Sequence, residues 1–274
     1  MIEKTLLSVA VITFNEEENL ARTLKAVKPL ADEIIVVDSH STDRTREIAL
    51  NYGAKVFDED WKGHIAQKNS ALEKCVGKWI FSIDADEVLS AELAKAIAQA
   101  IAGENAEGFI ISRKSVYLGK TLNYMWRPDR HLRLVKRDAK PRWSGYNPHD
   151  ILTIEGKTAP LKGDLIHYSY KDLSDHWRRL IVYARLAAES YAQKGRRFSL
   201  FRLLFNPLWG IIKTYIFRLG FLDGIQGLLA AFSKGVYIFL KYAFLFELQL
   251  ASKKTSDKNK DAKRSNNGYR KESA

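Results

Sequence analysis

The sequence contains little cysteine and lacks a glycine-rich phosphate loop. Cys75 is the one cysteine in 274 residues, which excludes an intramolecular disulfide and a cysteine-rich zinc module. No G-x-G-x-x-G or G-x-x-x-x-G-K motif follows the first apolar run, so a backbone cradle for phosphate is not expected there. The same run ends at Thr13 and Asn15 instead of a small-residue cleavage site, which is poor for a signal peptide. We therefore expect a cytoplasmic protein.

The C-terminal part also lacks an uncharged apolar run of the roughly 20 residues that a membrane-spanning helix needs. Its longest such run, Gly224–Ser233, ends at Lys234, and Lys241 follows two helical turns later on the same face. We therefore expect residues 208–250 not to cross a membrane. They could lie among lipid headgroups or pack on the rest of the protein, and the sequence allows both.

The excess of 44 basic over 32 acidic side chains is unevenly distributed along the chain. Residues 1–170 contain 24 of each sign, whereas residues 171–251 contain 12 basic and 5 acidic residues, and residues 252–274 contain 8 and 3. A nucleic-acid-binding domain is usually basic where its motifs lie, and here the basic part is hydrophobic. We therefore expect an anionic membrane surface as a partner and no nucleic acid.

Short apolar runs alternate with helical patterns up to about residue 102. The runs predict buried strands, and the apolar stripes between them predict helices packed on a sheet. The predicted strands are Leu6–Ile12, Ile34–Val37, Lys55–Phe57 and Trp79–Ile83. The apolar stripes are Leu20/Leu24/Val27, Ile65/Leu72/Val76 and Leu93/Ile97/Ile101. Ser41 and Ser90 are placed to cap helices. This alternation predicts an α/β fold with a mostly parallel sheet, in which ligands bind at the carboxyl ends of the strands.

The pattern changes after residue 102. Gly108–Ser112, His131–Val135 and Asp164–Tyr170 predict further, partly antiparallel strands, and one apolar face from Leu173 to Tyr191 predicts a long helix that ends at Gly195. We expect a first domain over residues 1–170 and a helical, membrane-facing region over 171–251. Residues 252–274 have no large aliphatic side chain and predict a disordered basic tail.

Polar and acidic residues follow three of the predicted strands. One acidic strand end could simply cap a helix, but three at one sheet edge would concentrate negative charge unless a cation or a donor-rich ligand is present. Asp84 and Asp86, after the fourth strand, could direct two carboxylates around Mg²⁺ or Mn²⁺. These ions are commonly held by one or two carboxylates and substrate phosphates, so a metal-held nucleoside diphosphate would fit the missing glycine-rich loop.

These segments resemble, in order, the motifs of the inverting glycosyltransferases of family 2, which have the Rossmann-like GT-A fold. The matching residues are Thr13-x-Asn15-Glu16, Asp38-Ser39-x-Ser41-x-Asp43, Gln67-Lys68-Asn69 and Asp84-Ala85-Asp86-Glu87. Downstream, residues 143–145, 147–150, 166–168 and 220–224 resemble the subgroup that builds lipopolysaccharide core. The glucosyltransferases of that subgroup add a sugar to the inner-core heptose at the cytoplasmic face of the membrane.

The resemblance implies a role for each matched position. The nucleotide base and ribose would be bordered by Thr13, Asn15, Glu16, Asp38 and Asp43, and Asp84 would approach the ribose. The uracil or the diphosphate would be covered by Gln67, Lys68 and Asn69. The Mg²⁺ or Mn²⁺ ion would be held by Asp86. Similar enzymes use a late histidine as a further metal ligand, which would be His167 here. A core histidine bonded to backbone is an equal alternative for His167.

Inverting transfer needs one base on the acceptor side, and Asp150 is our candidate. The alternative is that Asp150 caps the segment that follows it. Three aromatic residues, Trp126, Trp143 and Tyr146, could stack on sugar rings or simply pack.

The sequence as a whole predicts a metal-dependent hexosyltransferase, peripheral on the inner face of the cytoplasmic membrane. By resemblance, the donor would be UDP-glucose, and the acceptor the lipopolysaccharide inner core or a similar lipid-linked saccharide. The alternative enzyme is a polyprenyl-phosphate glycosyltransferase. Two further alternatives are a nucleic-acid-binding protein, which would place its charge beside stacking aromatics, and a catalytically inactive scaffold.

Overall fold

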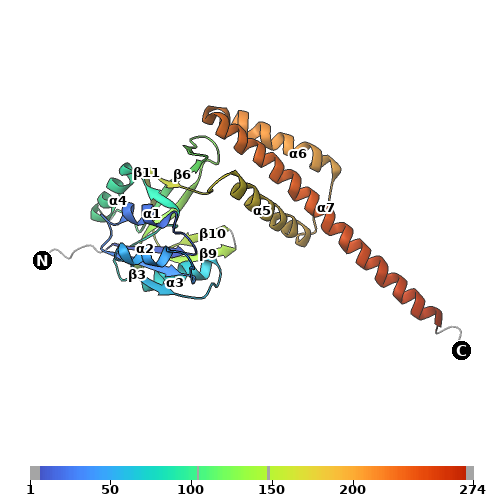
Figure 1. The fold of residues 1–274 in the computed structure, drawn as a ribbon, viewed down its shortest axis with the longest axis horizontal. Helices are drawn as coiled ribbons and strands as arrows, with labels where there is room; N and C mark the ends of the chain where they lie inside the picture. The colour runs from blue at the N-terminus through green and yellow to red at the C-terminus, as the bar shows by residue number, and fades with distance from the viewer. Residues whose placement is uncertain (1–6, 104, 147–148, 270–274) are drawn as a thin grey trace. The chain divides into compact units, whose positions relative to one another are not determined.

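The computed structural model describes residues 7–103, 105–146 and 149–269, with side chains up to residue 253 except those of residues 146 and 149. Contacts divide the chain into two compact units. Within the described ranges, the first unit contains residues 7–121 and 126–169, and the second contains residues 122–125 and 170–269. Figure 1 shows the strands of the first unit and the helices α5, α6 and α7 of the second.

The first unit is built on a mixed sheet of nine strands, ordered β3-β2-β1-β4-β8-β6-β11-β5, with β7 paired to β6. The strands β3, β2, β1 and β4 are mutually parallel, as are β6 and β11, whereas β8 runs antiparallel between the two groups. The bounds are β1 Leu7–Thr13, β2 Glu33–Asp38, β3 Lys55–Asp58, β4 Trp79–Ser82, β5 Glu87–Leu89, β6 Gly108–Tyr117, β7 Lys120–Thr121, β8 Arg130–Lys136 and β11 Thr158–His167. The predicted α/β fold is confirmed.

Four helices connect these strands: α1 Leu20–Val27, α2 Thr45–Asn51, α3 His64–Lys74 and α4 Ala91–Gly103. Ser90 Oγ accepts from Leu93 N at 3.2 Å, so Ser90 caps α4 as predicted. No apolar stripe marks α2 in the sequence, because its seven residues are too few to show one, and only the cap expected at Ser41 indicated a helix there. The capping role predicted for Ser41 was wrong, since α2 begins at Thr45 and its N-cap position is occupied by Arg44.

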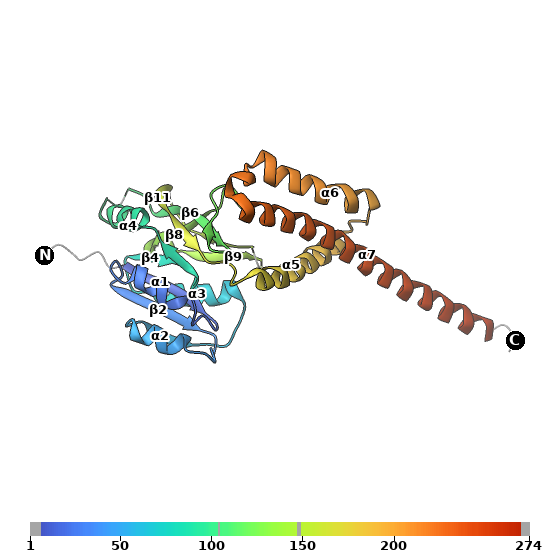
Figure 2. The same cartoon turned by 45° about the horizontal axis from the view of Figure 1, so that its top comes forward.

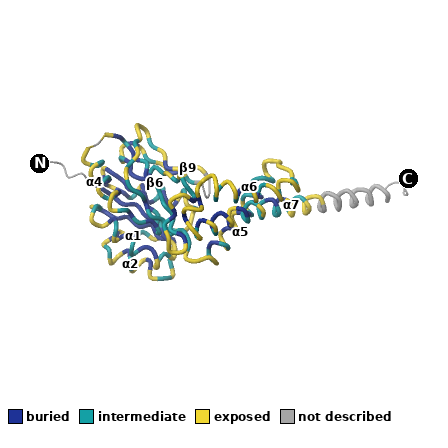
Figure 3. The backbone as a smooth tube through the Cα atoms, turned by 90° about the horizontal axis from the view of Figure 1, so that it is seen from above, coloured by how far each residue is buried: buried dark blue, intermediate teal, exposed yellow. Residues whose placement is uncertain are grey.

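The core of the first unit forms two clusters of buried apolar side chains. The larger cluster joins alternate residues of β1 and β4 to α1 and α4, and includes Leu24, Trp79 and Leu93. The smaller joins the other residues of the same strands to α3, and includes Ile80 and Leu72. Figure 3 shows this buried centre in dark blue. Because side chains alternate along a strand, runs as apolar as β1 and β2 indicate a sheet buried on both faces.

A two-stranded hairpin completes the first unit. It pairs β9, Arg142–Tyr146, antiparallel to β10, His149–Thr153, and follows the short 3-10 helix η1, Arg137–Ala139. In its register Asp150 lies opposite Gly145. Residues 147–148, which belong to the predicted Asn147–Asp150 segment, lie outside the described residues.

The second unit is helical. Its elements are α5 Leu173–Gln193, α6 Leu200–Ile212, the π-helical turn η2 Lys213–Phe217, the 3-10 helix η3 Gly220–Asp223 and α7 Gly224–Tyr269. The helices α6 and α7 lie side by side in Figures 1 and 2. A Cβ added to Gly210 would meet Ile238 at 2.5 Å, and one added to Gly235 would meet Ile211 at 2.6 Å, so glycine permits this close packing.

The length of α7 differs from the sequence-based expectation. Residues 220–253, which comprise η3 and the first part of α7, are long and apolar enough, by length and composition, to cross a membrane. Lys234 and Lys241 lie within this stretch without interrupting the helix, so length and composition alone would allow it to cross; the expectation that residues 208–250 do not cross stays a prediction. The predicted boundary at residue 252 falls inside α7, and residues 270–274 lie outside the described part of the chain.

Residues 122–125 belong to the second unit although they lie between β7 and β8 in the sequence. The buried carboxylate of Asp223 accepts three backbone N–H groups, from Asn123 at 2.9 Å, Tyr124 at 3.0 Å and Met125 at 2.8 Å. Charge-assisted hydrogen bonds of this kind are stronger than neutral ones. The Asp223 within the Gly220–Gly224 motif therefore fixes this short segment to the helical unit.

Candidate active site

Three of the predicted strand ends meet at one edge of the sheet. Thr13 and Asp38 are paired in register at the ends of β1 and β2. Ile83 N, just after β4, donates to Ala10 O of β1 at 3.1 Å, which places the residues after β4 at the same edge. In α/β sheets ligands bind outside the carboxyl ends of the strands.

The carboxylate of Asp38 organises the first part of this edge. Its Oδ1 accepts from Thr13 Oγ1 at 2.7 Å and from Ser41 Oγ at 2.6 Å, and its Oδ2 accepts from Ser41 N at 2.7 Å. Ser41 Oγ in turn accepts from Asn15 N at 2.8 Å, and Asn15 Oδ1 accepts from Thr42 N at 2.8 Å. The loops after β1 and β2 are therefore locked together, with Asp38 and Thr13 almost completely buried.

The next residues of these loops are held in the same way. Asp43 accepts from Glu17 N at 3.1 Å and from Thr45 N at 2.9 Å. Although burial opposes it, hydrogen bonding from Thr45 lowers the pKa of Asp43. Glu16 N donates to Thr45 Oγ1 at 2.7 Å, and the carboxylate of Glu16 accepts from Asn19 Nδ2 at 2.8 Å. The structure thus gathers Thr13, Asn15, Glu16, Asp38 and Asp43 into one connected loop pair.

Gln67 and Asn69, on α3, support neighbouring segments. Gln67 is fully buried and donates through Nε2 to Ser39 Oγ at 3.2 Å, while its Oε1 has no partner among the described residues. Asn69 makes a reciprocal pair with the backbone of Trp143, donating to its O at 2.9 Å and accepting from its N at 2.8 Å. Because both ends of this amide are engaged, Asn69 positions β9 and, through it, the β9–β10 hairpin.

Lys68 bridges two carboxylates. Its Nζ lies 3.0 Å from Asp84 Oδ1 and 2.7 Å from Asp150 Oδ2. Burial raises the pKa of Asp150, but the charge and hydrogen bond of Lys68 outweigh it, so the net shift is downward. The structure therefore brings the predicted base, the predicted lysine and the first acid after β4 into direct contact. Asp150 lies within β10, so no helix follows for it to cap.

Asp84 and Asp86 have different partners. Asp84 faces Lys68 and Arg133, which against the effect of burial hold the pKa of Asp84 well below its usual range. Asp86 Oδ2 instead lies 3.1 Å from His167 Nε2. Each carboxylate therefore has its own partners, Lys68 and Arg133 for Asp84 and His167 for Asp86.

The contact between His167 and Asp86 follows from strand pairing. The strand β11 runs antiparallel to β5, with His167 opposite Glu87, and Tyr168 N donates to Asp86 O at 2.9 Å. Although burial opposes it, the hydrogen bond to Asp86 raises the pKa of His167. The other ring nitrogen, Nδ1, lies 2.9 Å from Ser169 Oγ. Both ring nitrogens therefore face side chains, unlike the backbone-bonded core histidine that was the alternative.

The donor set of Asp86 and His167 fits a divalent metal of the Mn²⁺ or Mg²⁺ type. Carboxylate oxygen suits either ion, and an imidazole nitrogen, more typical of Zn²⁺ and Fe²⁺ sites, is a further donor beside it. No group of three metal-binding side chains is assembled within the part of the chain whose side chains the structure describes. Two protein ligands leave several coordination positions for diphosphate oxygens and water, which is how Mg²⁺ is usually held.

Sequence reasoning missed Arg113 and Arg133, and it gave no role to Glu87, which it had matched to the family motif. Arg133, 3 % exposed on β8, donates through Nη2 to Asp84 at 2.8 Å and to Glu87 at 3.0 Å, and Arg113 of β6 lies 3.2 Å from Glu87. Glu87 is fully buried and accepts from Asp84 N at 3.0 Å. A lone arginine inside the alternating apolar run of β8 was the available signal.

The predicted aromatic residues have different surroundings. The side chain of Trp143 is almost completely buried, with Lys68 Nζ 4.4 Å and Arg133 Cζ 5.7 Å from its ring centroid. It therefore lines the charged cluster through cation–π contacts and is not an open face for a sugar. The ring of Trp126 meets Tyr117 edge-on at 5.3 Å. The side chain of Tyr146 lies outside the described residues.

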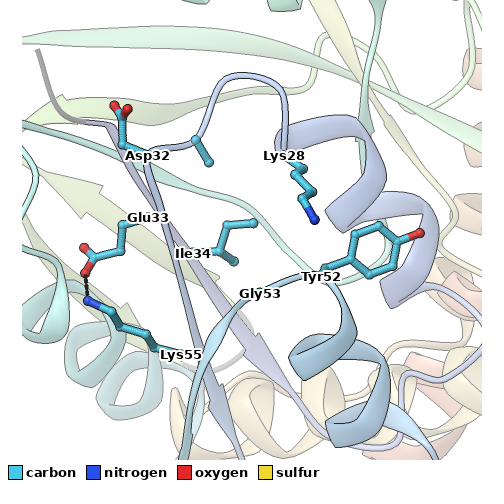
Figure 4. Close-up of a pocket in the computed structure, with 8 residues that line it drawn as sticks. Lys28, Asp32, Glu33, Ile34, Tyr52, Gly53 and Lys55 are labelled. Atoms are coloured by element: carbon cyan, nitrogen blue, oxygen red, sulfur yellow. Dashed lines mark hydrogen bonds and ion pairs between the residues drawn. The ribbon is translucent and has the colours of Figure 1, made fainter. Parts of the chain in front are cut away.

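A pocket of about 340 Å³ lies at the opposite edge of the sheet and is shown in Figure 4. Glu33 and Lys55, the first residues of β2 and β3, form an ion pair of 2.8 Å at its wall, and Lys28 and Tyr52 line its other side in Figure 4. None of the predicted site residues lines it.

The family match and the sequence relatives both identify glycosyltransferases. The family described as glycosyl transferase family 2 matches residues 8–154. An uncharacterized glycosyltransferase of Rickettsia typhi is 33% identical over 90% of this chain and 89% of its own length. The lipopolysaccharide core biosynthesis glycosyltransferase LpsC of Rhizobium meliloti is 30% identical over 90% of this chain and 94% of its own. Among solved structures, S. aureus TarS in complex with UDP-GlcNAc has a TM-score of 0.47 at 16% identity, covering 90% of this chain and 92% of that one.

Proposed function

Because the chain belongs to glycosyltransferase family 2, we propose that it transfers a hexose from a UDP-sugar to a lipid-linked saccharide with inversion at the anomeric carbon, and that Asp150 is the base. The supporting observation is the placement of Asp150, which the β9–β10 hairpin holds 2.7 Å from Lys68, beside the acidic edge of the sheet. Glucose is the proposed sugar, on the resemblance of the downstream motifs.

The nucleoside would occupy the edge formed by the loops after β1 and β2. Asp38 is the residue that fixes both loops there, through Thr13 and Ser41. A ribose hydroxyl would find carboxylate and hydroxyl acceptors in this network. Gln67 Oε1, buried without a partner among the described residues, is a further acceptor beside it.

The diphosphate would lie against the cationic side of the cluster. Lys68 and Arg133 place two positive charges beside Asp84. A diphosphate would compete with the carboxylates of Asp84 and Asp150 for Lys68. Asp86 and His167 would hold the Mg²⁺ or Mn²⁺ ion, which when bound neutralises charge on the leaving diphosphate. When Lys68 turns toward the diphosphate, Asp150 loses a partner and its carboxylate becomes a stronger base.

The transfer itself needs one proton to move. The acceptor hydroxyl attacks the anomeric carbon from the side opposite the diphosphate and passes its proton to an oxygen of Asp150. The carbon–oxygen bond to the UDP group breaks as the new glycosidic bond forms, which inverts the configuration. Before the donor binds, Lys68 lowers the pKa of Asp150 and stabilises the ionised carboxylate that the proton transfer needs.

The acceptor is proposed to be the lipopolysaccharide inner core or a similar lipid-linked saccharide. The support is the 30% identity to LpsC over nearly the full length of both chains. The protein would then work as a peripheral protein at the inner face of the cytoplasmic membrane, where such acceptors are made. A polyprenyl phosphate remains the competing acceptor.

A two-stage assay tests this function. A screen of sugar nucleotides for Mn²⁺-dependent release of the nucleoside diphosphate should select a UDP-hexose. The hexose of the selected donor should then be transferred to heptose-containing core lipid and not to polyprenyl phosphate. Transfer to polyprenyl phosphate alone would reject the proposed acceptor but keep the enzyme class. Absence of both release and transfer with every donor would reject the enzyme class and favour an inactive scaffold.

A further inference from the structure

The outward face of α6 is almost entirely apolar. Its exposed large side chains recur every three to four residues, so they lie along one side of the helix. They are Leu200, Phe201, Leu204, Phe205, Leu208, Trp209 and Ile212, each between 42% and 64% exposed. We call these seven residues the α6 apolar face. Soluble proteins rarely expose so large a continuous apolar surface without a partner for it.

The opposite side of α6 is well packed, so the exposure does not reflect a loose helix. Pro207 and Gly210 are buried, and Asn206 Nδ2 donates to the hydroxyl of Tyr242 on α7 at 3.0 Å. Ser199 Oγ caps the helix by accepting from Arg202 N at 3.5 Å. One side of α6 is therefore fixed to α7, and the apolar face points away from it.

The charges around this face have one sign. From Lys194 to Phe246 the sequence contains eight basic residues and one acidic residue, Asp223. The acidic residue is buried and binds the three N–H groups of residues 123–125, so it offers no negative charge at the surface. The exposed basic residues nearest α6 in the sequence are Arg196, Arg197, Arg202, Lys213 and Arg218.

We infer that the α6 apolar face inserts into the interfacial layer of an anionic lipid bilayer, with α6 lying in the membrane plane. Apolar side chains on one face, a tryptophan among them and basic residues beside them are the features of helices that lie in this layer. The thirteen residues of α6 are about 20 Å long, shorter than the roughly 30 Å hydrocarbon core, and η2, which continues the helix to Phe217, adds the charged Lys213 to Arg202, so this stretch suits the interface better than a crossing.

The neighbours of α7 oppose the alternative that α7 crosses the bilayer. Its other side packs against α5, where Arg185 pairs with Glu247 at 2.7 Å and Tyr191 accepts from Lys241 Nζ at 3.3 Å. The helix α5 also carries exposed Arg178 and Arg179. A crossing α7 would bring these charges into hydrocarbon, which is costly, whereas insertion through α6 leaves them in water.

Vesicle flotation of the full chain tests the inference without requiring enzymatic activity. The protein should float with vesicles of equimolar phosphatidylcholine and phosphatidylglycerol. The double variant Leu204→Gln/Leu208→Gln, altered at two exposed positions, should lose at least tenfold in binding. The matched control is Leu50→Gln/Val76→Gln, which removes two equally exposed apolar side chains from the first unit and should bind like the wild type. Equal binding by the α6 variant would overturn the inference.

Charge and self-association are tested separately. Arg197→Gln/Lys213→Gln should weaken binding to the mixed vesicles by about fivefold for each charge, and should leave binding to phosphatidylcholine alone unchanged. Sedimentation of the lipid-free protein tests the alternative that a second copy of the chain covers the α6 apolar face. A dimer that Leu204→Gln/Leu208→Gln dissociates would assign the face to self-association and overturn the inference.

Thiol labelling distinguishes a protein that lies on the bilayer through α6 from one whose helix α7 crosses the bilayer. Cys75 is buried, and burial raises the pKa of its thiol to about 12, so the native cysteine gives little background. Arg218→Cys and Ser252→Cys place single reporters near the two ends of the apolar part of α7. In sealed inside-out membrane vesicles both should react with an impermeant maleimide, because both ends stay on the cytoplasmic side. Protection of one end alone would show that α7 crosses, and would overturn the inference.

Discussion

Lys68 Nζ lies 2.7 Å from Asp150 Oδ2, although 82 residues separate the two in the sequence. The lysine comes from α3, which packs on the parallel part of the sheet, and the aspartate comes from the β9–β10 hairpin. Asn69, next to Lys68, fixes β9 through the backbone of Trp143. The helix α3 therefore places the cation Lys68 beside the proposed donor position. Through Asn69 it also sets the distance between Lys68 and the proposed base, Asp150.

Replacing Asp150 should separate binding from transfer. Asp150→Asn keeps the size of the side chain but cannot take a proton, so transfer should fall by about 10²–10⁴-fold. Binding of UDP, measured by calorimetry, should stay within about threefold, since Asp84 still pairs with Lys68. Ile151→Ala, at an exposed position of the same strand, is the control. Transfer at a comparable rate in Asp150→Asn would place the base elsewhere.

Replacing Lys68 should shift the pH dependence of the reaction. Lys68 lowers the pKa of Asp150, so Lys68→Met raises that pKa, and the acid limb of kcat/KM should move to higher pH. The limb moves upward because Asp150 must be ionised to act and now loses its proton only at a higher pH. Affinity for the donor should fall as well, since a cation facing the diphosphate is lost. The control Lys62→Met, on the exposed loop before α3, should change neither the acid limb nor the affinity for the donor. If the acid limb stays at the wild-type pH in Lys68→Met, the assignment of Asp150 as the base is contradicted.

Chelation and ligand replacement test the metal pair. Release of UDP should stop in EDTA and return with Mn²⁺, because Asp86 and His167 are the proposed ligands of the ion that neutralises the leaving diphosphate. His167→Gln should raise the Mn²⁺ concentration for half-maximal release at least about tenfold, the lower end of what loss of a supporting group costs. Asp58→Asn, at the end of β3, should behave like the wild type. Full activity in EDTA would exclude a metal at this pair.

Arg133 should matter for stability as well as for the donor. Its guanidinium is 3% exposed and is the partner of Glu87, whose carboxylate is completely buried. Arg133→Met leaves that carboxylate with Asp84 N and one cation, Arg113, and breaking a buried pair in this way costs about 3–5 kcal/mol. The urea midpoint of the first unit should therefore fall clearly, whereas Arg130→Met, exposed on the same strand, should leave it nearly unchanged. A stable Arg133→Met would show that the pair is dispensable to the fold.

The sequence alone was sufficient for the parallel part of the sheet. Strands such as β1 and β2 are buried on both faces, so their composition is apolar without interruption and their ends are visible. The clustering of Thr13 and Asp38 follows from this, because neighbouring parallel strands end at the same edge. Predictions for these elements depend on local pattern and one general rule, and both held.

What the sequence did not reveal depends on pairings between distant segments. Arg133 reaches Asp84 only because β8 inserts antiparallel beside β4, and nothing in the local pattern of either strand specifies that pairing. The same holds for β5, three residues long, whose register with β11 brings His167 to Asp86. The extent of α7 was missed for a different reason: single lysines end an apolar run in the sequence but do not end a helix.

The three N–H groups that converge on Asp223 determine where this protein can be divided. A fragment ending after Ser169 would look like a complete catalytic domain, yet it would retain residues 122–125 without the carboxylate that binds them. Cutting the gene at that point therefore leaves an unsatisfied loop in one product and a buried, uncompensated anion in the other. Expression of the two halves as separate soluble pieces is expected to fail unless the segment from Leu122 to Met125 is redesigned together with the cut.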